Sequence, residues 1–115
     1  MRDLVATLER ELRTDRKLTS RITKVDAATY TVLLTDDVIW STYTSTGAVT
    51  VTLPTAAFMR ERRLIIKDGD GNASANNITI NGQSGETIDG SASAVISTNY
   101  GKIEIITDGS TWITI

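Results

Sequence analysis

The sequence of 115 residues contains no cysteine and no histidine. Without cysteine, neither a disulfide framework nor a thiolate metal site can form. Without histidine, the chain lacks the commonest general base, the usual partner of a serine nucleophile and the commonest transition-metal ligand. We therefore expect a protein that is not an enzyme and that carries no cofactor.

Long apolar runs and a strong charge of one sign are also missing. No run approaches the roughly 18 residues that a membrane-spanning helix requires, and Met1 to Asp3 do not begin a signal peptide. The formal net charge is −2, with seven basic and four acidic residues in the first 24 and five basic and ten acidic residues in the remainder. This asymmetry of charge is too small to form the basic stripe that nucleic-acid binding requires. We expect one soluble domain with neither membrane nor nucleic acid as a partner.

The chain begins with an amphipathic segment. Leu4, Leu8 and Leu12 recur every four residues beside Val5, a spacing that predicts a helix over residues 1 to about 14. Such a short helix is marginal alone in water, so we expect residues 1–17 to dock on a partner through these four side chains. That partner stays open among its own β domain, other copies of the chain and a larger assembly.

From residue 29 onward the pattern becomes all-β, after a connector over residues 18–28 that can add an edge strand. Short runs rich in Thr, Val, Tyr and Trp alternate with turn formers about every 10 to 12 residues. Pro54, the only proline, ends the strand that precedes it, and residues 101–115 form the clearest hairpin. Residues 29–115 are therefore predicted to be a mainly β domain, an antiparallel β-sandwich or roll of about 7–9 short strands.

The predicted exposed strand faces carry Thr and Ser far more often than Lys or Glu. Edge strands of an isolated β domain usually carry charge that prevents further pairing. A neutral, Thr-rich surface is instead easily buried against an identical neighbour. This composition favours oligomerisation.

The segment Asp68-x-Asp70-x-Asn72 copies the first three ligand positions of a calcium loop, but the later positions do not fit. Ala73 stands where the loop needs glycine, and Thr79 stands where it needs glutamate. We interpret the segment as a turn and assign no metal ligand.

Other polar and aromatic residues are candidate site residues. Most carboxylates that could serve acid–base chemistry fall at predicted turns, where Asp bonds its own backbone, so we assign no catalytic residue: Asp36, Asp37, Glu86, Asp89, Glu104 and Asp108. Trp40 and Tyr43 are the candidate exposed ligand contacts. Trp112 and Tyr100 are expected to anchor the terminal hairpin.

Several pieces follow one another in a characteristic order: Gly47, VTVTLPTA (49–56), Arg62-Arg63, IIKDGDGNA (65–73), NNITI (76–80), ETIDG (86–90), Tyr100 and IITDGSTWITI (105–115). In this order the chain resembles a small β module widespread in virion proteins of tailed bacteriophages. The resemblance implies a structural or adsorption element without catalysis, commonly a homotrimer, found in head fibres, capsid decoration proteins and the ends of tail fibres.

Only one short predicted helix precedes the module, which favours a homotrimeric capsid decoration or head-fibre protein over a complete tail fibre. The resemblance then implies that the chain lies in the virion, with the helix and the basic connector facing other virion proteins. The alternative is a tail-fibre or tail-tip adsorption module that binds host surface glycan, for which Trp40 and Tyr43 are the candidate contacts.

Overall fold

The computed structural model describes residues 20–45 and 47–115. The helix predicted over residues 1 to about 14, and the docking contacts expected of Leu4, Val5, Leu8 and Leu12, lie outside the described residues. Residues 22–25, within the predicted connector, form a strand at the edge of one sheet.

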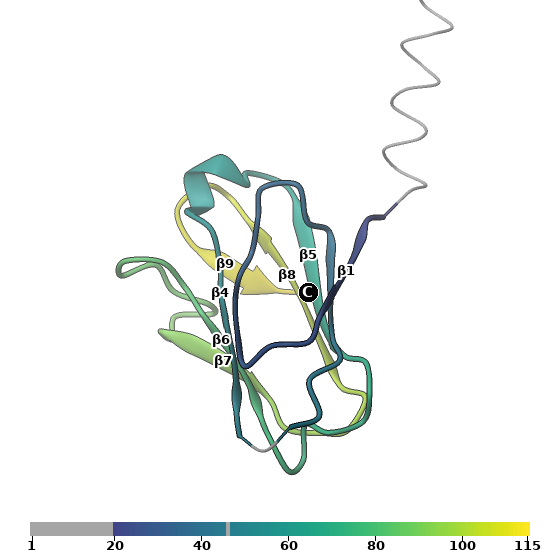
Figure 1. Ribbon diagram of the computed structural model, residues 1–115. Helices are drawn as coiled ribbons and strands as arrows, with labels where there is room; N and C mark the ends of the chain where they lie inside the picture. Colours follow the sequence, from purple (N-terminus) through teal and green to yellow (C-terminus); the bar gives the residue numbers. More distant parts are fainter. Residues whose placement is uncertain (1–19, 46) are drawn as a thin grey trace, which may run out of the picture.

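The described chain folds into nine short strands and one turn of 3-10 helix (Figure 1). They are β1 (Ile22–Val25), β2 (Thr29–Thr31), β3 (Val38–Ser41), β4 (Val49–Thr52), η1 (Ala56–Phe58), β5 (Arg63–Asp68), β6 (Ile78–Asn81), β7 (Ser93–Ile96), β8 (Lys102–Thr107) and β9 (Trp112–Thr114). Sheet A has the order β1-β3-β5-β8-β9, and sheet B has the order β2-β4-β6-β7. The prediction of a mainly β, sandwich-like domain is confirmed.

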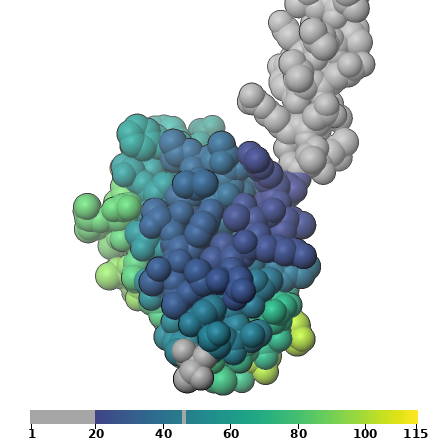
Figure 2. Space-filling model, viewed as in Figure 1, coloured from purple at the N-terminus to yellow at the C-terminus, as the bar shows by residue number. Residues whose placement is uncertain are grey.

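The prediction of an antiparallel sandwich is wrong, because the first six strands alternate between the two sheets. The chain passes along sheet A in one direction and returns along sheet B in the other. Each new strand in a sheet therefore runs in the same direction as the previous strand of that sheet. Pairing is parallel between β1, β3 and β5 and between β2, β4 and β6. These six strands form three stacked coils, and the space-filling view looks onto the first of them (Figure 2).

Antiparallel pairing begins only where the last three strands close the sheets. β7 pairs with β6, β8 pairs with β5, and β9 pairs with β8, so the predicted hairpin over residues 101–115 is confirmed. The run Thr87 to Gly90 forms only isolated bridges, through Ile88. Pro54 lies just beyond the end of β4, as the sequence predicts, and η1 follows it. In the part of the chain that the structure describes, no helix is both long and apolar enough to cross a bilayer.

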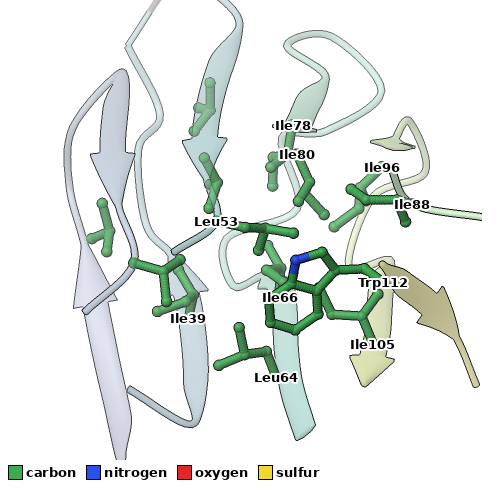
Figure 3. Close-up of a cluster of buried hydrophobic side chains, with 14 of the residues drawn as sticks. Ile39, Leu53, Leu64, Ile66, Ile78, Ile80, Ile88, Ile96, Ile105 and Trp112 are labelled. Atoms are coloured by element: carbon green, nitrogen blue, oxygen red, sulfur yellow. The ribbon is translucent and has the colours of Figure 1, made fainter. Parts of the chain in front are cut away.

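The core lies between the sheets and is built from stacked rows of aliphatic side chains (Figure 3). In sheet A, Ile39 and Ile66 occupy adjacent positions on neighbouring coils, and in sheet B Val51 and Ile80 do the same. Trp112 fills the C-terminal side of the core and is fully buried, although its indole nitrogen finds no hydrogen-bond partner. The apolar burial of the ring therefore outweighs the cost of that one unpaired donor.

The two valines of sheet B that differ most in burial provide a test of this core. Val51 is 1% exposed and faces the interior, whereas Val95 is 48% exposed on the outer side of β7. We expect Val51→Ala to lower the free energy of unfolding by about 2 kcal/mol, since it removes buried methyl groups and leaves a cavity. Val95→Ala should change it by less than about 0.5 kcal/mol. Equal losses in urea denaturation would contradict the assigned facing of these strands.

Candidate functional site

The two ends of the sandwich can be told apart by where the described chain begins. The strands β1, β3 and β5 start at that end, which we call the proximal end, and finish at the opposite, distal end (Figure 1). The proximal end carries η1 and the loops at residues 32–37, 82–92 and 108–111. The distal end carries the loops at residues 42–45 and 47–48, 69–77 and 97–101. Each end presents a different chemistry.

At the proximal end, a buried carboxylate holds the first coil together. Asp36 accepts hydrogen bonds from the hydroxyls of Thr23 (2.7 Å) and Tyr30 (2.6 Å) and from the backbone N–H of Leu33 (2.8 Å). Burial acts to raise the pKa of Asp36, but these donors outweigh it and hold the pKa below its ordinary value. Burial and the bond to Asp36 together raise the pKa of Tyr30 to about 12. Asp36 therefore links β1, β2 and the loop that follows β2.

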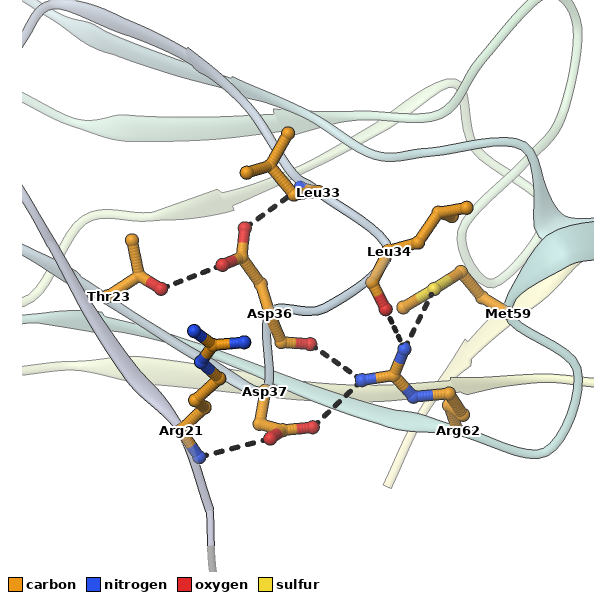
Figure 4. A network of polar contacts seen from close by, with 8 residues as sticks. All are labelled: Arg21, Thr23, Leu33, Leu34, Asp36, Asp37, Met59 and Arg62. Atoms are coloured by element: carbon orange, nitrogen blue, oxygen red, sulfur yellow. Dashed lines mark hydrogen bonds and ion pairs between the residues drawn. The ribbon is translucent and has the colours of Figure 1, made fainter.

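Arg62 ties this loop to the segment between η1 and β5 (Figure 4). Its guanidinium donates to the carboxylate of Asp37 (2.8 Å), the backbone carbonyl of Asp36 (2.9 Å) and the carbonyl of Leu34. The other carboxylate oxygen of Asp37 accepts the backbone N–H of Arg21 at 3.0 Å. Both carboxylates considered for catalysis here are thus engaged in holding loops.

Three large apolar side chains remain exposed at the proximal end despite this rigid support. Leu33 and Leu34 project from the loop after β2, and Phe58 projects from the end of η1. Arg21 and Arg60 are also exposed in this part of the molecule. Apolar side chains held outward on a fixed loop, with arginines nearby, are typical of a surface that contacts another protein.

At the distal end, the carboxylate of Asp68 organises the loop that the sequence marks as a turn. It is buried at the end of β5 and accepts backbone N–H groups from Asn72 (2.8 Å), Ala73 (2.9 Å) and Tyr100 (3.0 Å). Gly71 and Asp70 add longer contacts at 3.2 and 3.4 Å. Burial acts to raise the pKa of Asp68, but the backbone donors outweigh it and hold the pKa below its ordinary value.

Two aromatic rings rest on glycines of this loop. A side chain on Gly69 would overlap the indole of Trp40, since an added Cβ would lie 1.4 Å from its Nε1 atom. An added Cβ on Gly71 would lie 2.6 Å from the ring of Tyr100. Only glycine allows the loop backbone to approach both rings so closely. The backbone of Tyr100 has a φ of 61°, a conformation that is unusual for an aromatic residue.

A lysine accompanies each ring. The Nζ atom of Lys24 lies 5.7 Å from the centre of the Trp40 ring, and that of Lys67 lies 6.0 Å from the centre of the Tyr100 ring. Lys67 also donates to the backbone carbonyl of Tyr100. Cation–π attraction at these distances helps to hold the rings in place. We call Trp40, Tyr100, Lys24 and Lys67, with the loop beneath the two rings, the distal aromatic platform.

The predicted ligand contacts are therefore only partly brought together. Trp40 is half-buried on the outer side of sheet A, whereas Tyr43 packs against the core and is not part of the platform. Tyr100, which was expected to anchor the terminal hairpin, is 59% exposed and supplies the second ring instead. Gly69 and Gly71 were the available signal, because alternate glycines leave room for two rings on one loop.

The remaining carboxylates considered for catalysis bond to nearby backbone or side chains. Asp89 accepts from the backbone and hydroxyl of Thr114, and Asp108 accepts from the backbone of Ser110 and Thr111. Glu86 accepts the backbone N–H of Ala56, and Glu104 pairs with Arg63 at 3.5 Å. Among residues 20–45 and 47–115, no three acidic side chains are grouped closely enough to hold a metal ion.

The outer faces of the two sheets differ in composition. Outward positions in sheet B are neutral and polar apart from Val95: Thr29, Thr31, Thr50, Thr52, Thr79, Asn81 and Ser93. This agrees with the expectation of Thr-rich faces. Sheet A departs from it, because six aliphatic side chains face outward there: Ile22, Val38, Ile65, Ile106, Ile113 and Ile115. We call these six residues the aliphatic band.

The role of Asp68 can be tested by Asp68→Asn, which keeps the size of the side chain but removes its charge. We expect the free energy of unfolding at pH 7 to fall by at least about 2 kcal/mol, because several amide donors lose an ionised acceptor. Asp70→Asn is the matched control, since Asp70 lies exposed in the same loop. Unfolding by urea, followed by circular dichroism, would measure both variants.

The same pair of variants predicts a pH dependence. The folded-state pKa of Asp68 lies below the ordinary value of 3.8, so its stabilisation is present above that value and is lost as the pH falls through the folded pKa. The difference in stability between the wild type and Asp68→Asn should therefore shrink on acidification below about pH 4. A difference that stays constant down to about pH 2 would contradict this role.

Comparison with known proteins assigns no family to the chain. No protein-family model matches it, and no curated protein sequence matches it.

Proposed function

We propose that this chain is a non-catalytic structural protein of a tailed-bacteriophage virion, a homotrimeric capsid decoration or head-fibre protein. The observation that carries this proposal is the difference between the two ends of the β domain. The proximal end exposes Leu33, Leu34 and Phe58 beside the polar loops at residues 82–92 and 108–111, and the distal end exposes Tyr100 and loops rich in Asn, Ser, Gly and Thr. A particle-surface protein needs one end that attaches and one that faces solvent.

The position of the chain's beginning supports the same orientation. The described residues start at Ser20 at the proximal end, so the segment that carries Leu4, Leu8 and Leu12 is covalently continuous with the end that exposes Leu33, Leu34 and Phe58. The sequence predicts that this segment docks on a partner. In the proposed virion protein, the proximal end and the N-terminal segment together contact the particle, and the distal loops face outward.

The hydrogen-bonded loops suit a protein that must keep its shape without catalysing a reaction. Asp36 and Arg62 fix the proximal loops, and Asp68 fixes the distal ones. Their polar groups are used to satisfy one another and the backbone. A preformed surface also binds a particle with a smaller loss of conformational entropy than a flexible one.

The attachment surface can be tested by co-sedimentation of the full chain with capsids of the phage that encodes it, prepared without this protein. We expect the wild type to bind and Leu33→Asp/Leu34→Asp to bind roughly tenfold or more weakly, because charged groups would be buried in the contact. Thr35→Asp is the matched control, since Thr35 is exposed in the same loop. Absence of wild-type binding at micromolar concentration would contradict the proposal.

A second candidate function is supported by the distal aromatic platform. In this alternative the chain is a tail-fibre or tail-tip adsorption module, and Trp40 and Tyr100 stack against the sugars of a host surface glycan. The rings are held outward by glycine contacts and lysines, as preorganised stacking surfaces require. Tyr100 replaces Tyr43 as the second candidate contact.

Binding of the full chain to an array of bacterial surface polysaccharides distinguishes this alternative. If it holds, Trp40→Ala and Tyr100→Ala should each weaken binding by roughly tenfold or more, because each removes a stacking surface. Phe58→Ala is the control, since Phe58 is an exposed aromatic residue at the opposite end. Equal binding by all three variants, or no glycan binding by the wild type, would rule the platform out as a glycan site.

A further inference from the structure

The aliphatic band crosses the outer face of sheet A from one edge strand to the other. Ile22 lies on β1, Val38 on β3 and Ile65 on β5, and these three are paired side by side. Ile106 on β8 and Ile113 on β9 are likewise paired. Ile115 follows β9, and its backbone N–H donates to the carbonyl of Glu104 at 2.9 Å. The band therefore has a member on each of the five strands. Glu104 lies opposite Ile65 and Arg63 lies opposite Ile106, so this ion pair separates the members on β1, β3 and β5 from those on β8 and β9.

The exposure of the band is highest at its two ends. Ile22 is 55% exposed at one edge, and Ile113 and Ile115 are 48% and 56% exposed at the other. The strands between them carry half-buried members. A solvated face of a sheet normally carries polar residues, and sheet B of this chain follows that rule. Exposed aliphatic side chains gathered at both edges of one sheet face indicate a surface that another molecule covers.

The charges around the band favour a partner of the same kind. The only acidic side chain among the outward strand positions of sheet A is Glu104, and Arg63 pairs with it at 3.5 Å. Lys24, Lys67 and Lys102 form a row at the distal margin, away from the middle of the band. The band itself thus presents a locally neutralised aliphatic surface, which complements another aliphatic surface better than a charged one.

The entry point of the chain favours the same partner. Only Ser20 and Arg21 lie between the first 19 residues and β1, so this N-terminal segment is continuous with sheet A at the edge that carries Ile22. If the apolar stripe of Leu4, Leu8 and Leu12 associates between copies in parallel, it brings their β1 edges toward one axis. The end of each band would then lie beside a neighbouring copy.

We propose that the aliphatic band is the contact between copies of this chain, arranged in a closed ring. In the ring, each copy meets one neighbour through its Ile22 end and the other neighbour through its Ile113 end. The number of copies, three, rests on the proposed function, whereas the surface is identified from the described residues. The lysine row stays at the rim of the contact, where it remains hydrated.

The test is the mass of the full chain in solution, measured by analytical ultracentrifugation from submicromolar to about 50 micromolar. We expect the wild type to sediment at three times the chain mass of 12.5 kDa. Ile22→Lys and Ile113→Lys should each weaken association by roughly 30-fold or more, because each places a charge in every contact of the ring. If Ile113→Lys fails to fold, Ile115→Lys tests the same end of the band, because it alters a residue outside the regular strand. It should weaken association to the same extent.

Val95→Lys is the matched control. Val95 is an aliphatic residue on the edge strand of the other sheet and has the same 48% exposure as Ile113. It should leave the trimer intact. Retention of the trimer by all the isoleucine variants would overturn the band as the contact, and loss in only one of Ile22→Lys and Ile113→Lys would overturn the ring.

A monomeric wild type would overturn the proposal, and hydrogen exchange would then identify the occupant. If residues 1–17 lose protection in Ile113→Lys without a change in mass, the band is covered by the chain's own N-terminal segment. Capsid co-sedimentation is read separately. A monomeric chain that binds capsids would support the proposed virion role and overturn this interface. A trimer that binds no capsid would support the interface and overturn the virion role.

Discussion

The structure depends on one constraint, which is that a single coil cannot bury its inner face alone. Each coil offers one short strand to each sheet, and its inward residues are covered only when the next coil stacks on it. Ile39 against Ile66, and Val51 against Ile80, are the units of this stacking. Every loop therefore has to bring the chain back in register. The buried carboxylates of Asp36 and Asp68 act at two of these returns, where they replace missing strand pairing with amide and hydroxyl donors.

The sequence specifies the faces of the strands better than it specifies their partners. Val49, Val51 and Leu53 alternate with threonines, and they are buried as that alternation predicts. The direction of pairing was wrong because a turn between two β runs looks alike whether the chain returns to the same sheet or crosses to the other. Adjacent pairs such as Ile65-Ile66 and Ile105-Ile106 place one residue in the core and one outside, so their hydrophobicity alone concealed the aliphatic band.

In the candidate surfaces, too, the sequence predicts what neighbouring residues determine and misses what depends on contacts between distant parts of the chain. Trp40 was identified because a large aromatic residue on a short strand is conspicuous in the sequence. Tyr100 was assigned to the hairpin, since nothing local indicates that its backbone adopts a positive φ held by a carboxylate 32 positions earlier. The use of Asp68 as an acceptor was foreseeable in kind, because Asp commonly caps a turn. Its reach to Tyr100 depended on the pairing of β5 with β8.

The place of Trp112 in the core has a consequence for how the protein is made. This side chain is buried by strands that are synthesised much earlier, and the strand that carries it pairs with β8 at the end of sheet A. A chain that ends before residue 112 lacks this ring, so the interior of the three coils stays open on that side. Aliphatic interior exposed in this way is what proteases and chaperones recognise.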